Sequence, residues 1–251
     1  DFHRIQCTPD LMPTDVLGVN FYNQKTSEFE FRPGPIFSQV VLTDEINRAT
    51  PRTQSSLLEA MQERQVTVDG VTSTLAEPFL VMATQNPVEM EGTFPLPEAQ
   101  LDRFMIRVEI GYPTADEEAS IYSRFEKDAV PPTLEAVTSA EELALLQGLP
   151  PNVRVEENVR DYIVALVVAT RDDDSFALGA SPRAGLALYK TSQAWAAIDG
   201  RDYVTPDDVK KMARSVLPHR MILASAARLR GGSAEQVVDE MLTTVPVPIE
   251  R

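Results

Sequence analysis

Two adjacent acids, Asp44 and Glu45, close the segment Val-Val-Leu-Thr-Asp-Glu at residues 40–45. A short apolar, β-branched run predicts a buried strand of a parallel sheet. Neighbouring strand residues point to opposite faces, so the two carboxylates can do different work. One can hold Mg²⁺ through its water shell, and the other can orient a water for attack on a γ-phosphate. Taken alone, the segment is equally compatible with a strand that ends in solvated acids.

Asn86 follows a second apolar run, residues 79–83, much as Asp44 follows the first. In open parallel sheets, ligands bind beyond the carboxyl ends of the strands, so both side chains could reach one edge. An amide there can hold the attacking water or touch the γ-phosphate. The alternative is an ordinary turn asparagine before Pro87.

Two arginines could supply positive charge. Arg103 precedes a third apolar run, residues 104–110, and its planar fork of donors suits phosphate oxygens. Its alternative role is an ion pair with Asp102 or Glu98. Arg183 follows Ser181 and a proline, which together mark a helix start. There its charge opposes the helix dipole by roughly 0.3–1 kcal/mol, which a nearby anion would reverse. A solvated arginine remains the alternative.

The surrounding sequence predicts the elements that must position these residues. Strands are expected at 2–7, 40–45, 79–83 and 104–110, a helix opened by Pro9, a helix from Pro51 capped by Thr50, a hairpin within 18–37, and a hairpin at 65–75 around Asp69-Gly70. Beyond Gly111-Tyr112-Pro113 helical periodicity dominates. We therefore expect a strand-bearing part, residues 1–112, followed by an all-helical part, residues 113–251.

The composition argues against two classes of protein, those that bind nucleic acid and those that insert into a membrane. The formal net charge of −15 over 251 residues argues against a nucleic-acid partner, which needs basic surface. No apolar run approaches 18 residues, so membrane insertion is not expected. The single cysteine, Cys7, cannot form an internal disulfide and favours a reducing compartment. We expect a cytoplasmic protein.

Four blocks carry a resemblance to a known family. They are residues 42–48 (Leu-Thr-Asp-Glu-Ile-Asn-Arg), 58–70 (Leu-Glu-Ala-Met-Gln-Glu-Arg-Gln-Val-Thr-Val-Asp-Gly), 83–87 (Ala-Thr-Gln-Asn-Pro) and 96–104 (Leu-Pro-Glu-Ala-Gln-Leu-Asp-Arg-Phe). In this order and spacing the chain resembles the AAA+ ATPases of the MoxR family over nearly its whole length. The resemblance implies an α/β fold, in which a P-loop-type parallel sheet core precedes an all-α lid.

The resemblance also implies roles. Asp44 matches the Walker B residue that holds Mg²⁺, Glu45 the general base and Asn86 sensor 1. Arg103 matches the arginine finger that acts on ATP held by a neighbouring subunit, and Arg183 matches sensor 2. Residues 18–37 resemble the insert in the second helix of this clade, and 65–75 its pre-sensor-1 hairpin. The implied cofactors are ATP and Mg²⁺, in a homo-oligomer that is a hexameric ring, with a von Willebrand factor A domain protein as partner.

One departure from the family is large. The phosphate-cradling loop Gly-x-x-x-x-Gly-Lys-Ser/Thr is absent from these residues. Because the family places this loop before the strand that matches residues 2–7, we expect that the sequence lacks its N-terminal part and that this piece alone is inactive. The main expectation is an ATPase that remodels a partner complex. The alternatives are a non-hydrolysing assembly subunit, a metal-chelatase motor subunit and, against the charge, a nucleic-acid motor.

Overall fold

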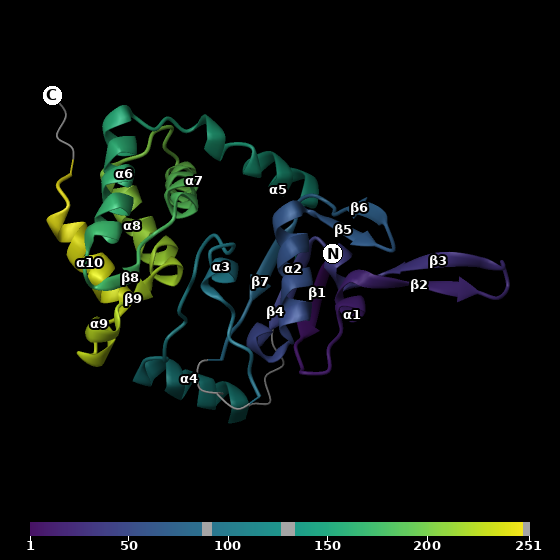
Figure 1. The fold of residues 1–251 in the computed structure, drawn as a ribbon. Helices are drawn as coiled ribbons and strands as arrows, with labels where there is room; N and C mark the ends of the chain where they lie inside the picture. The colour runs from purple at the N-terminus through teal and green to yellow at the C-terminus, as the bar shows by residue number, and fades with distance from the viewer. Residues whose placement is uncertain (87–91, 127–133, 248–251) are drawn as a thin grey trace.

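The computed structural model describes residues 1–86, 92–126 and 134–247. Its central sheet contains β1 (Phe2–Gln6), β4 (Val40–Asp44) and β7 (Leu80–Ala83), in the order β1-β4-β7. Both pairings are parallel, with Gln6 opposite Asp44 and Thr43 opposite Ala83. The three strands therefore end at one edge of the sheet, as the sequence predicts (Figure 1).

Helices α1 (Pro13–Leu17) and α2 (Pro51–Glu63) pack beside each other against this sheet (Figure 1). The predicted start of α2 is confirmed, because the Thr50 hydroxyl accepts a hydrogen bond from the Thr53 amide. Leu57 and Leu58 are buried in the same cluster as Val41 of β4. Each such side chain stabilises the fold by about 1.5–3 kcal/mol relative to exposure. This packing fixes the sheet edge where the acids lie.

Two hairpins extend from this layer (Figure 1). Strands β2 (Gly18–Asn23) and β3 (Glu28–Pro33) form one, and β5 (Gln65–Val68) and β6 (Val71–Thr74) form the other. Asp69 and Gly70 both have positive φ, which a two-residue turn between right-twisted strands requires. Both hairpins are thus present as the sequence predicts.

Two predicted elements are wrong. Thr8–Asp10 form a turn, with the Leu11 amide bonded to the Thr8 carbonyl, and the helix begins later at Pro13. Residues 104–110 are irregular instead of a strand. A strand exists only through hydrogen bonds to a neighbouring strand, and no described strand pairs with this segment. Its alternating apolar pattern alone cannot create that pairing.

The remaining elements follow in chain order. They are η1 (Pro35–Phe37), η2 (Ile46–Arg48), α3 (Glu98–Leu101), α4 (Ala115–Glu126), α5 (Ala140–Gln147), η3 (Pro150–Asn152), α6 (Glu157–Asp172), β8 (Phe176–Leu178), α7 (Pro182–Ile198), α8 (Pro206–Val216), η4 (Pro218–Arg220), β9 (Ile222–Leu223), α9 (Ser225–Leu229) and α10 (Ala234–Thr244). We call β1–α3 the sheet part and α4–α10 the helical part.

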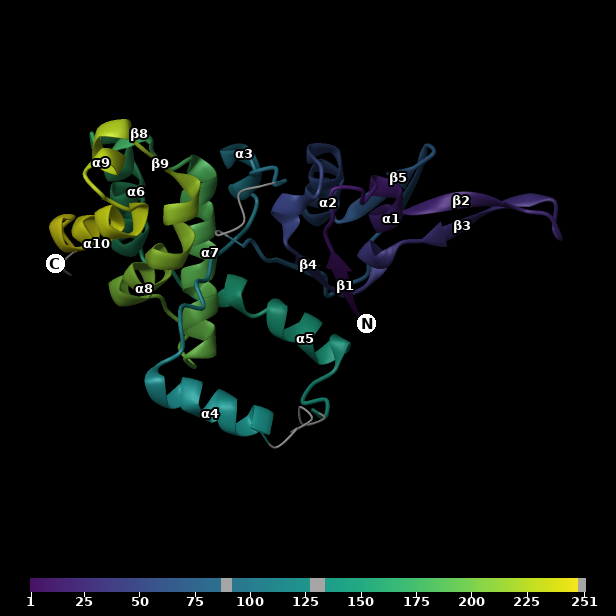
Figure 2. The same ribbon diagram turned by 90° about the horizontal axis from the view of Figure 1, so that it is seen from below.

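The helical part contains its own core. Helices α6, α7, α8 and α10 bury a second cluster that includes Leu166, Leu188, Val209 and Val238. The part predicted to be all-helical also includes one short antiparallel strand pair, β8 with β9. In contrast, α4 and α5 contain no buried residue, and Figure 2 shows them lying outside both packed bodies. No helix among the described residues has the length and apolar character needed to cross a bilayer.

Candidate active site

Asp44 is held by two side chains at the carboxyl edge of the sheet. Its carboxylate accepts hydrogen bonds from the Thr84 hydroxyl and from the Arg4 guanidinium, which also forms an ion pair with it. Arg4 comes from β1, and Thr84 directly follows β7, so the two flanking strands both contribute. The Asp44 side chain is only 22% exposed, whereas that of Arg4 is 58% exposed. A partner on such an exposed side chain can be exchanged for another cation at little cost.

Glu45 lies just past the strand in the left-handed region, with φ 54°. Few non-glycine residues adopt this conformation, and it turns the chain into η2. The Glu45 amide donates to the Thr84 hydroxyl at 2.9 Å, while its carboxylate accepts from Gln6 at 3.0 Å and from Arg48 at 3.1 Å. The separate surroundings of the two acids thus come from this turn, whereas the sequence predicted them from strand alternation.

The hydrogen bonds at the strand tips stabilise the ionised form of Asp44. The Thr84 hydroxyl, followed by the Arg4 guanidinium, lowers the pKa of Asp44. Asp44 is therefore fully ionised at neutral pH, as a magnesium ligand must be. The pKa of Cys7, which follows β1, is shifted in the opposite direction. Burial, together with the negative charges of Asp44 and Glu45, raises the pKa of this thiol to about 11.

The chain leaving β7 brings Asn86 to the same edge. The Ile46 amide donates to the Thr84 carbonyl at 3.0 Å, and the Thr84 amide donates to the Thr43 carbonyl at 2.9 Å. These bonds tie the ends of β4 and β7 together. Asn86 follows Thr84 by two residues and is half-buried. Asp44, Glu45 and Asn86 are thus gathered at one sheet edge.

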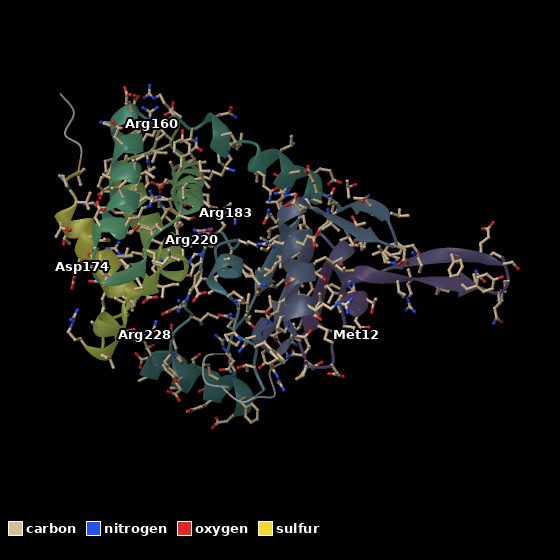
Figure 3. The ribbon with its side chains drawn as sticks, in the orientation of Figure 1. Met12, Arg160, Asp174, Arg183, Arg220 and Arg228 are labelled. Carbon is tan, nitrogen blue, oxygen red and sulfur yellow. The ribbon has the colours of Figure 1, made fainter. Side chains whose placement is uncertain are left out.

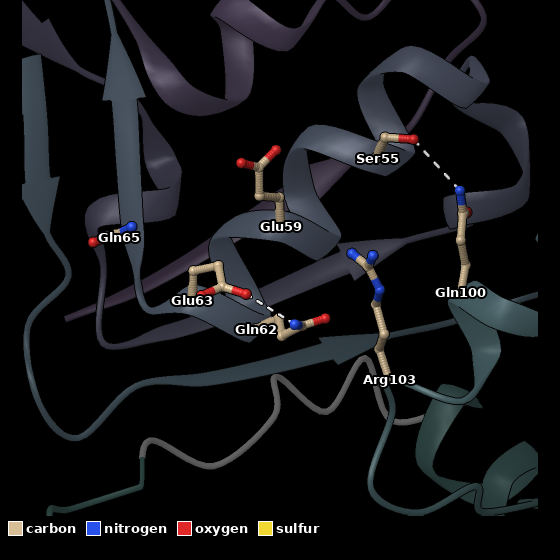
Figure 4. Close-up of a pocket in the computed structure, with 7 residues that line it drawn as sticks. All are labelled: Ser55, Glu59, Gln62, Glu63, Gln65, Gln100 and Arg103. Carbon is tan, nitrogen blue, oxygen red and sulfur yellow. Dashed lines mark hydrogen bonds between the residues drawn. The ribbon is translucent and has the colours of Figure 1, made fainter. Parts of the chain in front are cut away.

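Arg103 follows α3 and lies in a cleft of about 440 Å³ on the surface of α2. The cleft is lined by Ser55, Glu59, Gln62, Glu63, Gln65, Gln100 and Arg103. Figure 4 shows the Arg103 guanidinium directed across the face of α2 toward these side chains. Within the described residues, the hydrogen bonds and ion pairs of Asp44 and Glu45 do not include Arg103.

Arg183 lies in the first turn of α7, as predicted, behind the capping residue Ser181. Its guanidinium is 3.7 Å from the Asp102 carboxylate, which also accepts from the Ser181 hydroxyl at 3.2 Å. The second cation on Asp102 is Arg220, at 3.0 Å. Asp102, one of the two alternative partners considered for Arg103, therefore pairs with arginines of the helical part.

The predicted site residues thus fall into two groups. Asp44, Glu45 and Asn86 share the sheet edge. Arg183 instead pairs with Asp102, and Arg103 directly follows Asp102 in the chain. Sequence reasoning missed Arg4, Thr84 and Arg220. Thr84 could have been found, because it directly follows a strand that ends at the same edge. Nothing in the sequence indicates Arg220.

The site is chemically suited to a hydrated divalent cation on a phosphate. The described residues contain no group of three or more His, Cys, Asp or Glu side chains arranged to hold a metal. Mg²⁺ in phosphate sites usually takes only one or two carboxylates, with water and phosphate oxygens completing its octahedron. An ionised carboxylate beside a hydroxyl, as at Asp44 and Thr84, provides hard oxygen donors of that kind.

Comparison with known proteins places this geometry in a family. Residues 1–106 match the ATPase family associated with various cellular activities (AAA), and residues 168–241 match the AAA lid domain. The chain is 54% identical over its full length to the uncharacterized protein YeaC of Bacillus subtilis, covering 78% of that protein. It is 43% identical to the chaperone MoxR1 of Mycobacterium tuberculosis, over 98% of this chain and 67% of the other.

The fold has a close counterpart among solved structures. A crystal structure from Cytophaga hutchinsonii, of a protein provisionally classed as an ATPase, superposes with a TM-score of 0.90 at 40% identity. The superposition covers 99% of this chain and 78% of that one. The fold and the sheet edge thus define an α/β protein of the AAA+ ATPase class. Within that class, the chain belongs to the MoxR family.

Proposed function

We propose that this protein hydrolyses Mg²⁺–ATP and uses the energy to remodel or mature a partner protein complex. The observation that carries the proposal is the strand-tip pair, in which ionised Asp44 and the separately held Glu45 lie at the same edge as Asn86. Membership in a family of ATPases, with a chaperone among the named relatives, supports it. In this proposal ATP and Mg²⁺ are the cofactors, and the boundary between core and lid falls near residue 112.

Each residue then has a distinct task. Mg²⁺, when bound with ATP, would neutralise phosphate charge and fix the geometry of the β- and γ-phosphates. Asp44 would hold that ion after exchanging its Arg4 partner. Glu45 would leave Gln6 and Arg48, accept the proton of the attacking water and so act as general base. Asn86 would orient the water or a γ-phosphate oxygen, and Arg183 would contact the phosphates from α7.

Arg103 would act between subunits. Its guanidinium lies in the cleft on α2, outside the hydrogen bonds of Asp44 and Glu45 in its own chain. In a head-to-tail ring, such a residue can reach the site of the next subunit. We therefore propose a homo-oligomeric ring, with six subunits as the family resemblance implies. On the same resemblance we propose a partner protein that carries a von Willebrand factor A domain. An arginine that stabilises transition-state charge from a neighbour contributes about 10³–10⁵ in kcat.

The first test is Glu45→Gln in the complete encoded protein. We expect kcat for ATP hydrolysis to fall by at least about 100-fold, because the amide cannot accept the proton. Nucleotide affinity, measured by calorimetry, should change little. The matched control is Glu157→Gln, which makes the same change at an exposed carboxylate of α6 and should leave turnover unaltered. Near wild-type turnover in Glu45→Gln would falsify the assigned base.

The second test is subunit mixing. Arg103→Ala subunits keep their own acids but lack the proposed finger, and Glu45→Gln subunits keep the finger. Random mixing at equal amounts pairs an intact site with an intact finger at about one interface in four. Activity should therefore reappear when two nearly inactive preparations are combined. No recovery at any ratio would exclude a site shared between subunits.

A further inference from the structure

We infer that Arg220 is a positioning residue for Arg103, through which the helical part of a subunit sets the finger offered to its neighbour. The inference rests on the proposed function, since it presumes that Arg103 serves an adjacent nucleotide. The observations behind it are the contacts of Arg220 with the chain on both sides of Arg103. None of these contacts involves Arg103 itself.

Arg220 is nearly enclosed, with its side chain 2% exposed. Its guanidinium donates to the Asp102 carboxylate at 3.0 Å and to the backbone carbonyls of Asp102 at 3.4 Å, Phe104 at 2.5 Å and Met105 at 3.2 Å. A further bond reaches the Val216 carbonyl at 2.9 Å, within its own helical part. The planar five-donor fork of arginine can satisfy this many acceptors at once, which an ammonium group cannot.

The bonded carbonyls bracket Arg103 in the sequence. Asp102 precedes it, and Phe104 and Met105 follow it, so the main chain is fixed on both sides of the Arg103 Cα. Two neighbouring contacts strengthen the attachment. His219 lies with its Nε2 3.1 Å from the Phe104 carbonyl, and the Arg107 amide donates to the Ser215 carbonyl at 2.8 Å. These contacts replace the strand pairing that residues 104–110 lack here.

The same carboxylate also contacts the start of α7. Ser181 and Arg183 share one oxygen of Asp102, and Arg220 holds the other. Figure 3 shows Arg183 and Arg220 close together on the side of the helical part that faces α3. Arg183 is half exposed, whereas Arg220 is enclosed. An anion that draws Arg183 away would leave Asp102 attached through Arg220 and the Ser181 hydroxyl. Movement of α7 and the placement of Arg103 are thereby linked.

Arg103 would act through the position of its guanidinium, so a small displacement of that group would lower the rate of hydrolysis. A shift of about 1 Å in a catalytic group can lower the rate by about 100-fold. We call the set Asp102, Ser181, Arg183 and Arg220 the Asp102 cluster. Loss of Arg220 from this cluster should act on the neighbour's turnover, while the acids and Arg183 of the same subunit stay in place. This pattern separates positioning from a general effect on folding.

The test uses Arg220→Lys in the complete protein, which keeps the charge but loses the fork. Arg214→Lys is the matched control, because Arg214 pairs with Asp239 on the exposed surface of the helical part. We expect kcat to fall by about 10-fold or more in Arg220→Lys, with unchanged nucleotide Kd, and to recover on mixing with Glu45→Gln subunits. Hydrogen exchange over residues 102–107 should quicken. Arg214→Lys should match wild type in all measurements.

A second variant, Asp102→Asn, changes the other side of the same contact, and urea denaturation of both variants shows whether they remain folded. The same recovery on mixing is expected. Wild-type turnover in both variants, a loss that mixing does not restore, or unchanged exchange over residues 102–107 would overturn the role of Arg220. Absence of ATP hydrolysis in the wild-type protein, or full turnover in Glu45→Gln, would instead overturn the proposed function. The two failures are therefore distinguishable.

Discussion

The strand-tip acids and Asp102 both pair with arginines, but one of the two arginines on Asp102, Arg220, is far more buried than the rest. Arg4 and Arg48, the arginines on Asp44 and Glu45, have side chains 58% and 39% exposed. Arg220, on Asp102, is 2% exposed. Exposed ion pairs contribute about 0–1 kcal/mol and exchange partners readily, whereas a charge left unpaired in the interior is costly. The first set is therefore suited to receive a ligand, and the second to hold two parts of the chain together.

The largest difference between the two sets should appear when an arginine is removed. Arg220→Met would leave Asp102 without its enclosed cation and free several backbone carbonyls. We expect the free energy of unfolding to fall by about 3–5 kcal/mol, measured by urea denaturation. The matched variant Arg214→Met, on the exposed surface of the same helical part, should cost no more than about 1 kcal/mol. Equal losses in the two variants would contradict the difference in burial.

The pH dependence of stability should trace to the histidine beside Arg220. Burial lowers the pKa of His219 from 6.5 to about 4. The unfolded chain thus binds a proton at a pH where the folded protein does not, so His219 contributes stability above pH 6.5 that is lost as the pH falls toward 4. The loss should be about 3 kcal/mol between pH 7 and pH 4.

The check compares His219→Gln with a variant of the other histidine. Denaturation at several pH values should show a shallower loss between pH 6.5 and 4 in His219→Gln than in wild type. His3→Gln changes an exposed histidine on β1 and should leave the wild-type slope in place. If stability falls equally with pH in all three proteins, groups other than His219 cause the loss of stability at low pH.

A smaller effect is expected at the sheet edge from Thr84→Val. The change removes a hydroxyl that donates to Asp44 and accepts from the Glu45 amide. Stability should fall by about 1 kcal/mol, and the pKa of the Asp44 carboxyl should rise toward its ordinary value, as followed by NMR titration. Thr67→Val removes a hydroxyl that, within the described residues, pairs with Thr72, so it should leave the Asp44 titration unchanged.

The smallest change should come from Arg4→Met. Because the Arg4 side chain is largely in solvent, we expect a loss of no more than about 1 kcal/mol, which vanishes at high salt. The measurement is urea denaturation at low and at 1 M salt. A loss as large as that of Arg220→Met would show that the strand-tip pair holds the fold together and is not free to exchange partners.

Local signals in the sequence predicted most of the sheet part correctly. Thr50-Pro51 fixed the start of α2 because capping is a contact within one turn of helix. Asp69-Gly70 fixed a hairpin because only a few residues tolerate the required positive φ. The strand predicted at 104–110 was wrong for the opposite reason. Strand formation depends on a distant partner, and its backbone bonds go instead to Ser215 and Arg220 of the helical part.

The sequence by itself determined the chemistry available at the strand tips, because Asp44, Glu45 and Asn86 each follow an apolar run and parallel strands end together. It also determined the family, through blocks whose order and spacing are specific. Only the tertiary structure decided the neighbours of Asp102. Arg220 lies 118 residues further along the chain, and no local rule of periodicity or capping connects them. Contacts between residues so far apart in the chain form when the two separate cores pack together. That packing buries Arg220, whereas Arg4 remains exposed.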